Sequence, residues 1–89
     1  MIFNPGVSGG GGLRLIASGE NDNTTVQLPS PATYVIGQVG RQTVFVPPVN
    51  ILVGQQQNGG AVIYTLSADG MTLTMTSATP MGNWYAYGF

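Results

Sequence analysis

The 89-residue chain contains no cysteine, no histidine and no lysine. Without cysteine it has no disulfides and no thiolate metal sites, and without histidine it lacks the commonest zinc ligand. Without histidine, cysteine or lysine to act as base or nucleophile, acyl transfer and most acid–base chemistry lose their usual agents. We therefore expect no enzymatic activity, no catalytic residues, no metal site and no cofactor.

Charged residues are also scarce, at 6% of the chain, whereas they make up roughly 25% of ordinary soluble domains. The charged residues are Arg14, Glu20, Asp22, Arg41 and Asp69. A net charge of −1 without a basic cluster argues against binding to nucleic acids or to anionic membranes. Because 43% of the residues are hydrophobic, we expect subunit flanks that are covered by copies of the chain or by a partner. A neutral monomer solubilised by amides and hydroxyls is the alternative.

Targeting and membrane-spanning segments are not evident in the sequence. The first ten residues, MIFNPGVSGG, have neither the basic nor the apolar region of a secretory signal. The longest charge-free run, Gln42 to Ala68, is interrupted by Pro47-Pro48 and by a glutamine- and glycine-rich segment, which excludes a spanning helix. We expect a soluble, unprocessed product made in a cytoplasm.

The length predicts one small domain with a thin core, because a domain of this size buries only about 60% of its unfolded surface. Small domains compensate with disulfides, metals or oligomerisation. With the first two excluded, oligomerisation is the expected source of additional stability.

The segment from Ala61 to Thr76, AVIYTLSADGMTLTMT, predicts a β-hairpin. Apolar and more polar residues alternate along both halves, as in strands with one buried face. The expected buried row consists of Val62, Tyr64, Leu66, Met71, Leu73 and Met75. Gly70 of Asp69-Gly70 can adopt the positive φ that a hairpin turn requires.

Short β-rich runs separated by glycine, proline and polar turns occupy the rest of the chain. Strands are predicted at 13–18, 24–28, 33–39, 41–46, 49–53 and 83–89, with a polar turn at 19–23, a loop at 54–60 and a turn near 79–82. No window of about a dozen residues keeps a helical period of 3.6. The prediction is an all-β fold, a small antiparallel β-sandwich or jelly-roll-like domain at 13–89, preceded by a flexible glycine-rich N-terminal arm at 1–12.

Two groups of residues are candidates for interaction. Met1, Ile2 and Phe3 form an apolar tip ahead of the glycine run, which suits docking on a neighbouring subunit, although a disordered terminus explains it equally well. The second group consists of Trp84, Tyr85, Tyr87 and Phe89. On a strand, Trp84 points to the face opposite the other three. One face then belongs to the core, and the other meets either a subunit interface or a glycan.

Two further patterns have better structural explanations. The run Gly9 to Gly12 lacks the Lys-Ser/Thr and the following helix of a phosphate-binding loop. The oxygen-rich segment Glu20 to Asn23 has only two carboxylates, fewer than a calcium ion requires, and reads as a solvated turn.

Both ends of the chain resemble small tail-associated virion proteins of bacteriophages and prophages. The similar segments are SGGGGLRLIASGE and LSADGMTLTMTSATPMGNWYAYGF, and the matching positions are Gly9 to Gly12, Gly19, Asp69-Gly70, Trp84 to Tyr87 and Gly88. The chain departs from the family at Glu20 to Thr25, where the family has a second glycine- and threonine-rich segment.

The resemblance implies a non-enzymatic structural subunit of the virion, either a head-decoration (cement) protein or a tail or fibre appendage. The expected partners are other capsid or tail proteins and copies of the chain itself, with a trimer as one arrangement. No nucleic acid or membrane partner is expected. The alternative is a carbohydrate-binding module that recognises a host-surface glycan through its C-terminal aromatics.

Overall fold

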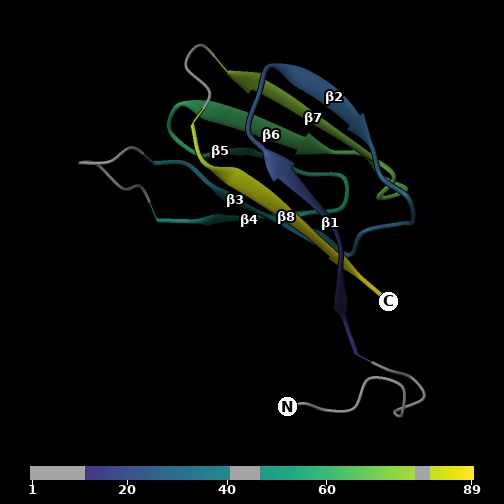
Figure 1. Ribbon diagram of the computed structural model, residues 1–89. Helices are drawn as coiled ribbons and strands as arrows, with labels where there is room; N and C mark the ends of the chain where they lie inside the picture. The colour runs from purple at the N-terminus through teal and green to yellow at the C-terminus, as the bar shows by residue number, and fades with distance from the viewer. Residues whose placement is uncertain (1–11, 41–46, 78–80) are drawn as a thin grey trace.

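The computed structural model describes residues 12–40, 47–77 and 81–89, and these residues form an all-β sandwich without a helix (Figure 1). The strands are β1 (Arg14–Glu20), β2 (Thr24–Gln27), β3 (Tyr34–Gln38), β4 (Val49–Leu52), β5 (Gln56–Asn58), β6 (Val62–Leu66), β7 (Thr72–Ser77) and β8 (Asn83–Gly88). The predicted fold class is confirmed. The N-terminal arm up to residue 11 and the strand predicted at 41–46 lie outside the described residues.

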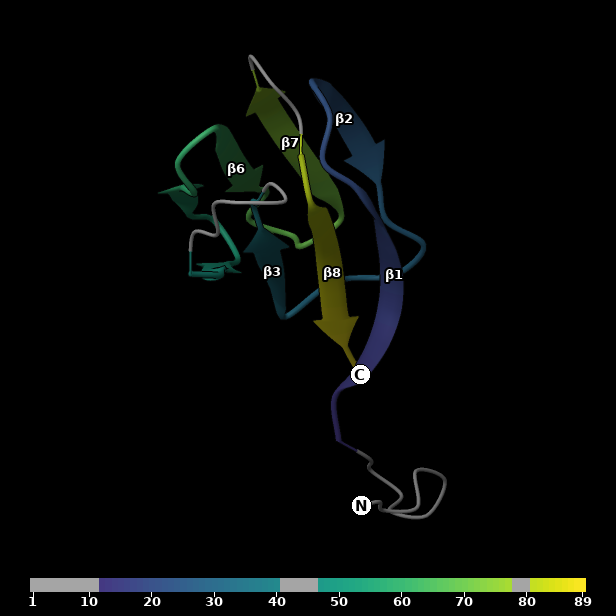
Figure 2. The ribbon, with the colours of Figure 1, turned by 60° about the vertical axis from the view of Figure 1, so that its left-hand side comes forward.

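The strands form two four-stranded antiparallel sheets that pack face to face (Figure 2). Sheet A has the order β1-β8-β3-β4 and sheet B the order β2-β7-β6-β5. The first strand pairs with the last and the second with the seventh, and this nesting of the chain ends gives the sandwich its jelly-roll-like character. By contrast, β3–β4 and β5–β6 are local pairs of consecutive strands.

The predicted hairpin is formed by β6 and β7, which pair from Val62–Ser77 to Leu66–Leu73. Gly70 has φ +73° in the connecting turn, as expected. The Asp69 carboxylate closes this turn by accepting hydrogen bonds from the Ser67 hydroxyl (2.6 Å) and the Met71 amide (3.0 Å). These bonds lower the pKa of Asp69, with the Ser67 hydroxyl as the larger cause.

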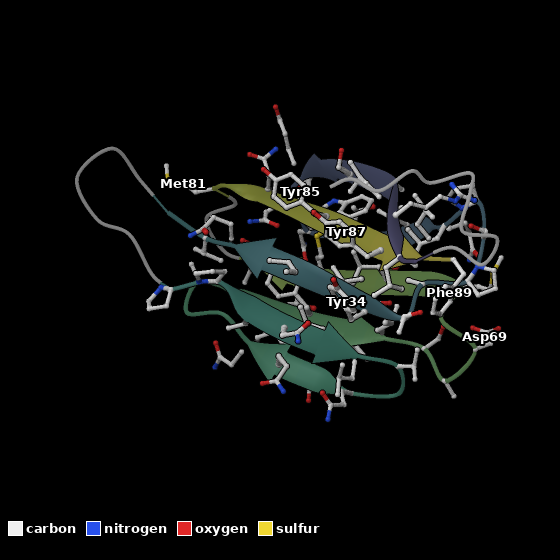
Figure 3. The ribbon with its side chains drawn as sticks, turned by 90° about the horizontal axis from the view of Figure 1, so that it is seen from below. Tyr34, Asp69, Met81, Tyr85, Tyr87 and Phe89 are labelled. Atoms are coloured by element: carbon white, nitrogen blue, oxygen red, sulfur yellow. The ribbon has the colours of Figure 1, made fainter. Side chains whose placement is uncertain are left out.

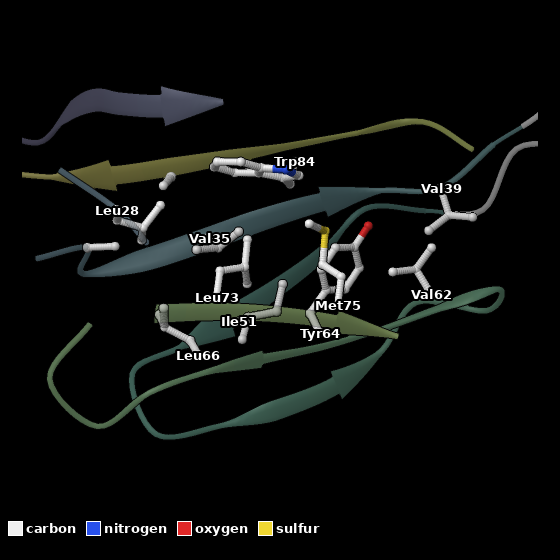
Figure 4. Close-up of a cluster of buried hydrophobic side chains, with 12 residues drawn as sticks. Leu28, Val35, Val39, Ile51, Val62, Tyr64, Leu66, Leu73, Met75 and Trp84 are labelled. Carbon is white, nitrogen blue, oxygen red and sulfur yellow. The ribbon is translucent and has the colours of Figure 1, made fainter. Parts of the chain in front are cut away.

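Buried hydrophobic side chains from both sheets make up the core between them (Figure 4). They are Leu28, Ala32, Val35, Val39, Ile51, Val62, Tyr64, Leu66, Leu73, Met75, Trp84 and Ala86. The Tyr64 ring of sheet B lies against the backbone of Gly37 in sheet A, where a Cβ atom would clash with the ring. Glycine at this position therefore lets the largest fully buried side chain fit between the sheets.

The turn after β1 differs from the prediction because Asn21 is buried and not solvated. Its side-chain amide donates to the carbonyl oxygens of Gln38 (3.0 Å) and Met81 (2.7 Å), and its Oδ1 accepts from the Tyr64 hydroxyl (2.8 Å). The Asn21 backbone amide also donates to the carbonyl of Gly82 (3.0 Å). Asn21 thus joins the β1–β2 connection, both sheets and the start of β8.

The glutamine- and glycine-rich segment at 54–60 was wrongly predicted as a loop throughout. Its residues 56–58 form β5, which pairs with β6 from Gln56–Thr65 to Asn58–Ile63 at the edge of sheet B. Glutamine and asparagine have little intrinsic preference for strands, so this element depends on backbone pairing with β6.

Candidate interaction face

The outer side of sheet A carries a surface to which all four of its strands contribute. Directly paired residues of an antiparallel sheet share a face. One row across the sheet consists of Leu15, Tyr87, Tyr34 and Leu52, and the next row of Ser18, Tyr85, Ile36 and Asn50. We call these eight residues the aromatic face. Figure 3 views the molecule from the side of sheet A, with Tyr34, Tyr85 and Tyr87 labelled on neighbouring strands.

The aromatic face is uncharged and mostly apolar, and its two edges are exposed to solvent. Leu15 is 50% exposed and Leu52 44%, at the two edges of the sheet. Between them the half-buried rings of Tyr34 and Tyr87 stack with centroids 5.3 Å apart and an interplanar angle of 25°. Phe89 follows β8 directly and is 74% exposed. Exposed apolar side chains gathered on one side of a sheet are a feature of interaction sites.

Polar residues border the aromatic face at one end. Glu20, Asn83 and Gln38 form the next row across β1, β8 and β3. The Asn83 side-chain amide donates to the carbonyl oxygen of Gly19 (3.2 Å). An apolar centre with a polar border is the usual composition of a protein–protein interface.

The outer side of sheet B has a different character. One row across its four strands consists of Thr25, Thr74, Thr65 and Gln56. In a neighbouring row the Thr72 hydroxyl donates to Oε1 of Gln27 (3.3 Å). We call this surface the threonine face. It confirms the prediction that the polar side of the β6–β7 hairpin points away from the core, and its hydroxyl and amide groups suit contact with water.

The structure divides the predicted C-terminal aromatic group between two environments. Tyr85 and Tyr87 lie on the aromatic face and Phe89 next to it, whereas Trp84 is 4% exposed in the core and packs over Gly19. The predicted alternation along this strand is confirmed. Trp84 is therefore not on the surface that a partner would contact. Met1, Ile2 and Phe3 lie outside the described residues.

Sequence reasoning missed six of the eight residues of the aromatic face, among them Leu15, Tyr34, Ile36 and Leu52. The alternation of Tyr34 and Ile36 indicates a shared face of one strand. The position of β3 between β8 and β4, however, depends on contacts between segments far apart in the chain. Only that sheet order brings Tyr34 next to Tyr87.

Ionisable groups are sparse around these surfaces. Within residues 12–40, 47–77 and 81–89, no group of three or more His, Cys, Asp or Glu side chains is arranged to hold a metal ion. Asn21 belongs to the oxygen-rich segment that was considered for calcium. Its side-chain oxygen Oδ1 already accepts a hydrogen bond from the Tyr64 hydroxyl. Burial raises the pKa of Tyr64 to about 12, and the hydrogen bond with Asn21 opposes this shift.

No protein-family model, curated protein or solved structure matches this chain. The described part of the chain also contains no helix long and apolar enough to cross a membrane.

Proposed function

We propose that the protein is a non-enzymatic structural subunit of a bacteriophage particle that assembles with copies of itself and with other virion proteins through the aromatic face. The observation that carries this proposal is the uncharged row of Leu15, Tyr87, Tyr34 and Leu52 across all four strands of sheet A. A surface of this composition gains free energy when a second protein removes it from water.

Burial of the aromatic face contributes favourable free energy to assembly. Burial of apolar surface contributes about 25 cal/mol per Å². A contact that covers a few hundred apolar Å² on each subunit therefore gains several kcal/mol before the entropic cost of association. When a subunit makes several such contacts in a particle, avidity strengthens its attachment further.

The virion setting is supported by the sequence resemblance at Gly9 to Gly12 and in the C-terminal segment. A subunit that decorates a head or extends a tail is made in the host cytoplasm and functions in the virion. Such a role requires a stable fold and a surface for packing, and the aromatic face provides that surface.

A pair of matched isoleucines provides the test. Ile36 and Ile63 are both half-buried on inner strands, Ile36 on the aromatic face and Ile63 on the outer side of sheet B. We expect the wild-type protein at micromolar concentration to sediment as a multiple of the 9.2 kDa chain, and Ile36→Ser to lower that mass. Ile63→Ser should leave the mass unchanged, with circular dichroism confirming that both variants fold. A monomeric wild-type protein would contradict the proposal.

Carbohydrate binding is the second candidate, because three tyrosines lie on the aromatic face and could stack on sugar rings. Two observations favour subunit packing over this alternative. Tyr34 and Tyr87 stack on each other, which covers part of the ring surface that a sugar would use, and Trp84 is buried. A glycan array with the wild-type protein and Tyr85→Ala distinguishes the two, since binding that is lost in the variant would favour the carbohydrate role.

A further inference from the structure

We propose that the apolar tip Met1-Ile2-Phe3 of one copy packs on the aromatic face of a neighbouring copy. This inference rests on the proposed function, because it names the segment of the partner that covers the face. Four features support it: where the arm joins the fold, how far it reaches, its lack of charge and the direction in which it leaves the sheet.

The arm joins the fold beside the aromatic face. β1 begins at Arg14, and Leu15 is the first residue of the row that continues through Tyr87 and Tyr34. Leu13, immediately before β1, is 42% exposed, so apolar surface continues from the aromatic face toward the arm. The start of β1 also lies next to the end of β8, where Arg14 pairs with Gly88.

The tether between the tip and the fold is long enough to reach another subunit. It comprises the nine residues 4–12, of which the last four are glycines. At about 3.3–3.6 Å per residue, nine extended residues span about 30 Å. Glycine imposes the fewest restrictions on backbone direction, so the tether can adopt the path that a neighbour requires.

The tip and the aromatic face are chemically matched. Residues 1–13 contain no charged side chain, and none of the eight residues of the aromatic face is charged. Contact between them therefore buries no charged side chain, which would be costly in an apolar environment. An isoleucine and a phenylalanine can pack against tyrosine rings and leucines on the opposite side of the contact.

The direction of the chain favours a neighbouring copy over the same copy. In Figures 1 and 2 the chain at residues 12 and 13 leads away from the sandwich at the end where β8 also terminates. The tether therefore starts in a direction away from its own sandwich. A tip packed on its own face would also remove the surface through which subunits assemble.

The first experiment tests whether the tip contributes to assembly. Ile2→Ser/Phe3→Ser is compared with Val7→Ser, a matched apolar-to-serine change within the tether, by sedimentation equilibrium of the full-length chain. We expect the double variant to weaken assembly at least about tenfold, as for the loss of a buried phenylalanine contact, and Val7→Ser to behave as wild type. An unchanged assembly constant for the double variant would overturn this inference alone. Stronger assembly would also overturn it, because the tip would then cover its own aromatic face.

A second experiment identifies the acceptor surface. The ¹⁵N-labelled double variant, which keeps the aromatic face, is mixed with unlabelled wild-type protein as the source of intact tips. We expect the amide signals of Tyr34, Leu52 and Tyr87 to shift, and no shift when the unlabelled protein is also the double variant. Shifts confined to sheet B would overturn the inference. If Ile36→Ser disrupts assembly while the arm variants do not, the proposed function stands and the role of the tip is wrong.

Discussion

Asn21 and Tyr64 show how single polar residues hold this small sandwich together. The two side chains meet between the sheets, and Asn21 also binds the carbonyl oxygens of Gln38 and Met81. Buried polar groups stabilise a fold when all of them have partners and are costly when one partner is removed. The pattern of the sequence at 20–23 is that of an ordinary turn, so this role could not be predicted before the position of Tyr64 was known.

The ionisation of Tyr64 predicts a loss of stability at high pH. Its pKa is about 12 in the folded protein and about 10 in an unfolded chain. A raised pKa means that the stabilising contribution is complete below pH 10 and is lost as the pH rises from 10 to 12, at about 1.4 kcal/mol per unit. Urea unfolding at pH 9 and pH 11.5 should show a larger decrease for the wild-type protein than for Tyr64→Phe. Equal decreases would show that Tyr64 is not the group responsible.

The terminal strand β8 illustrates what a period-2 pattern does and does not specify. The alternation of Trp84 with Tyr85 correctly predicts opposite faces, and the structure assigns Trp84 to the core and Tyr85 to the surface. The sequence alone could not make that assignment, because both faces of the strand are aromatic. The burial of Trp84 follows from Gly19 on β1, which leaves room for the indole.

Substitutions on β8 should separate folding from assembly. Trp84→Ala removes a buried aromatic side chain and is expected to lower the free energy of unfolding by about 3–5 kcal/mol. Tyr85→Ala, one residue along, is expected to change that energy little in dilute protein and to weaken assembly instead. Thermal unfolding at low concentration measures the first effect, and light scattering at high concentration the second. A stable Trp84→Ala variant with impaired assembly would reverse these assignments.

At the scale of the whole molecule, patterns within short segments predicted the local structure. The pairing of strands far apart in the chain could not be predicted from the sequence. The strand pattern and turn glycine of the β6–β7 hairpin are encoded within sixteen consecutive residues, and both predictions are confirmed. Partners far apart in the chain, such as β1 and β8, are set by the packing of the complete sandwich. The aromatic face is assembled from such partners, which is why only its β8 residues were identified from the sequence.

The lack of charge on the aromatic face predicts how assembly responds to salt. Interfaces that depend on ion pairs weaken as ionic strength rises, because salt screens exposed charges. Apolar burial is not screened, and sulfate strengthens it. Sedimentation in 50 and 500 mM sodium chloride should therefore give the same assembly constant, and sodium sulfate should increase assembly. A marked decrease in sodium chloride would instead point to charged residues such as Glu20 at the border.

The difference between the two outer faces has a consequence for how copies of the protein associate. A subunit that adheres through both faces could stack without limit, whereas this sandwich has an apolar outer surface on sheet A and hydroxyl and amide groups on sheet B. Copies that adhere through the aromatic face alone leave the outer side of sheet B in contact with water. A second layer of copies should therefore not stack on the outer side of sheet B.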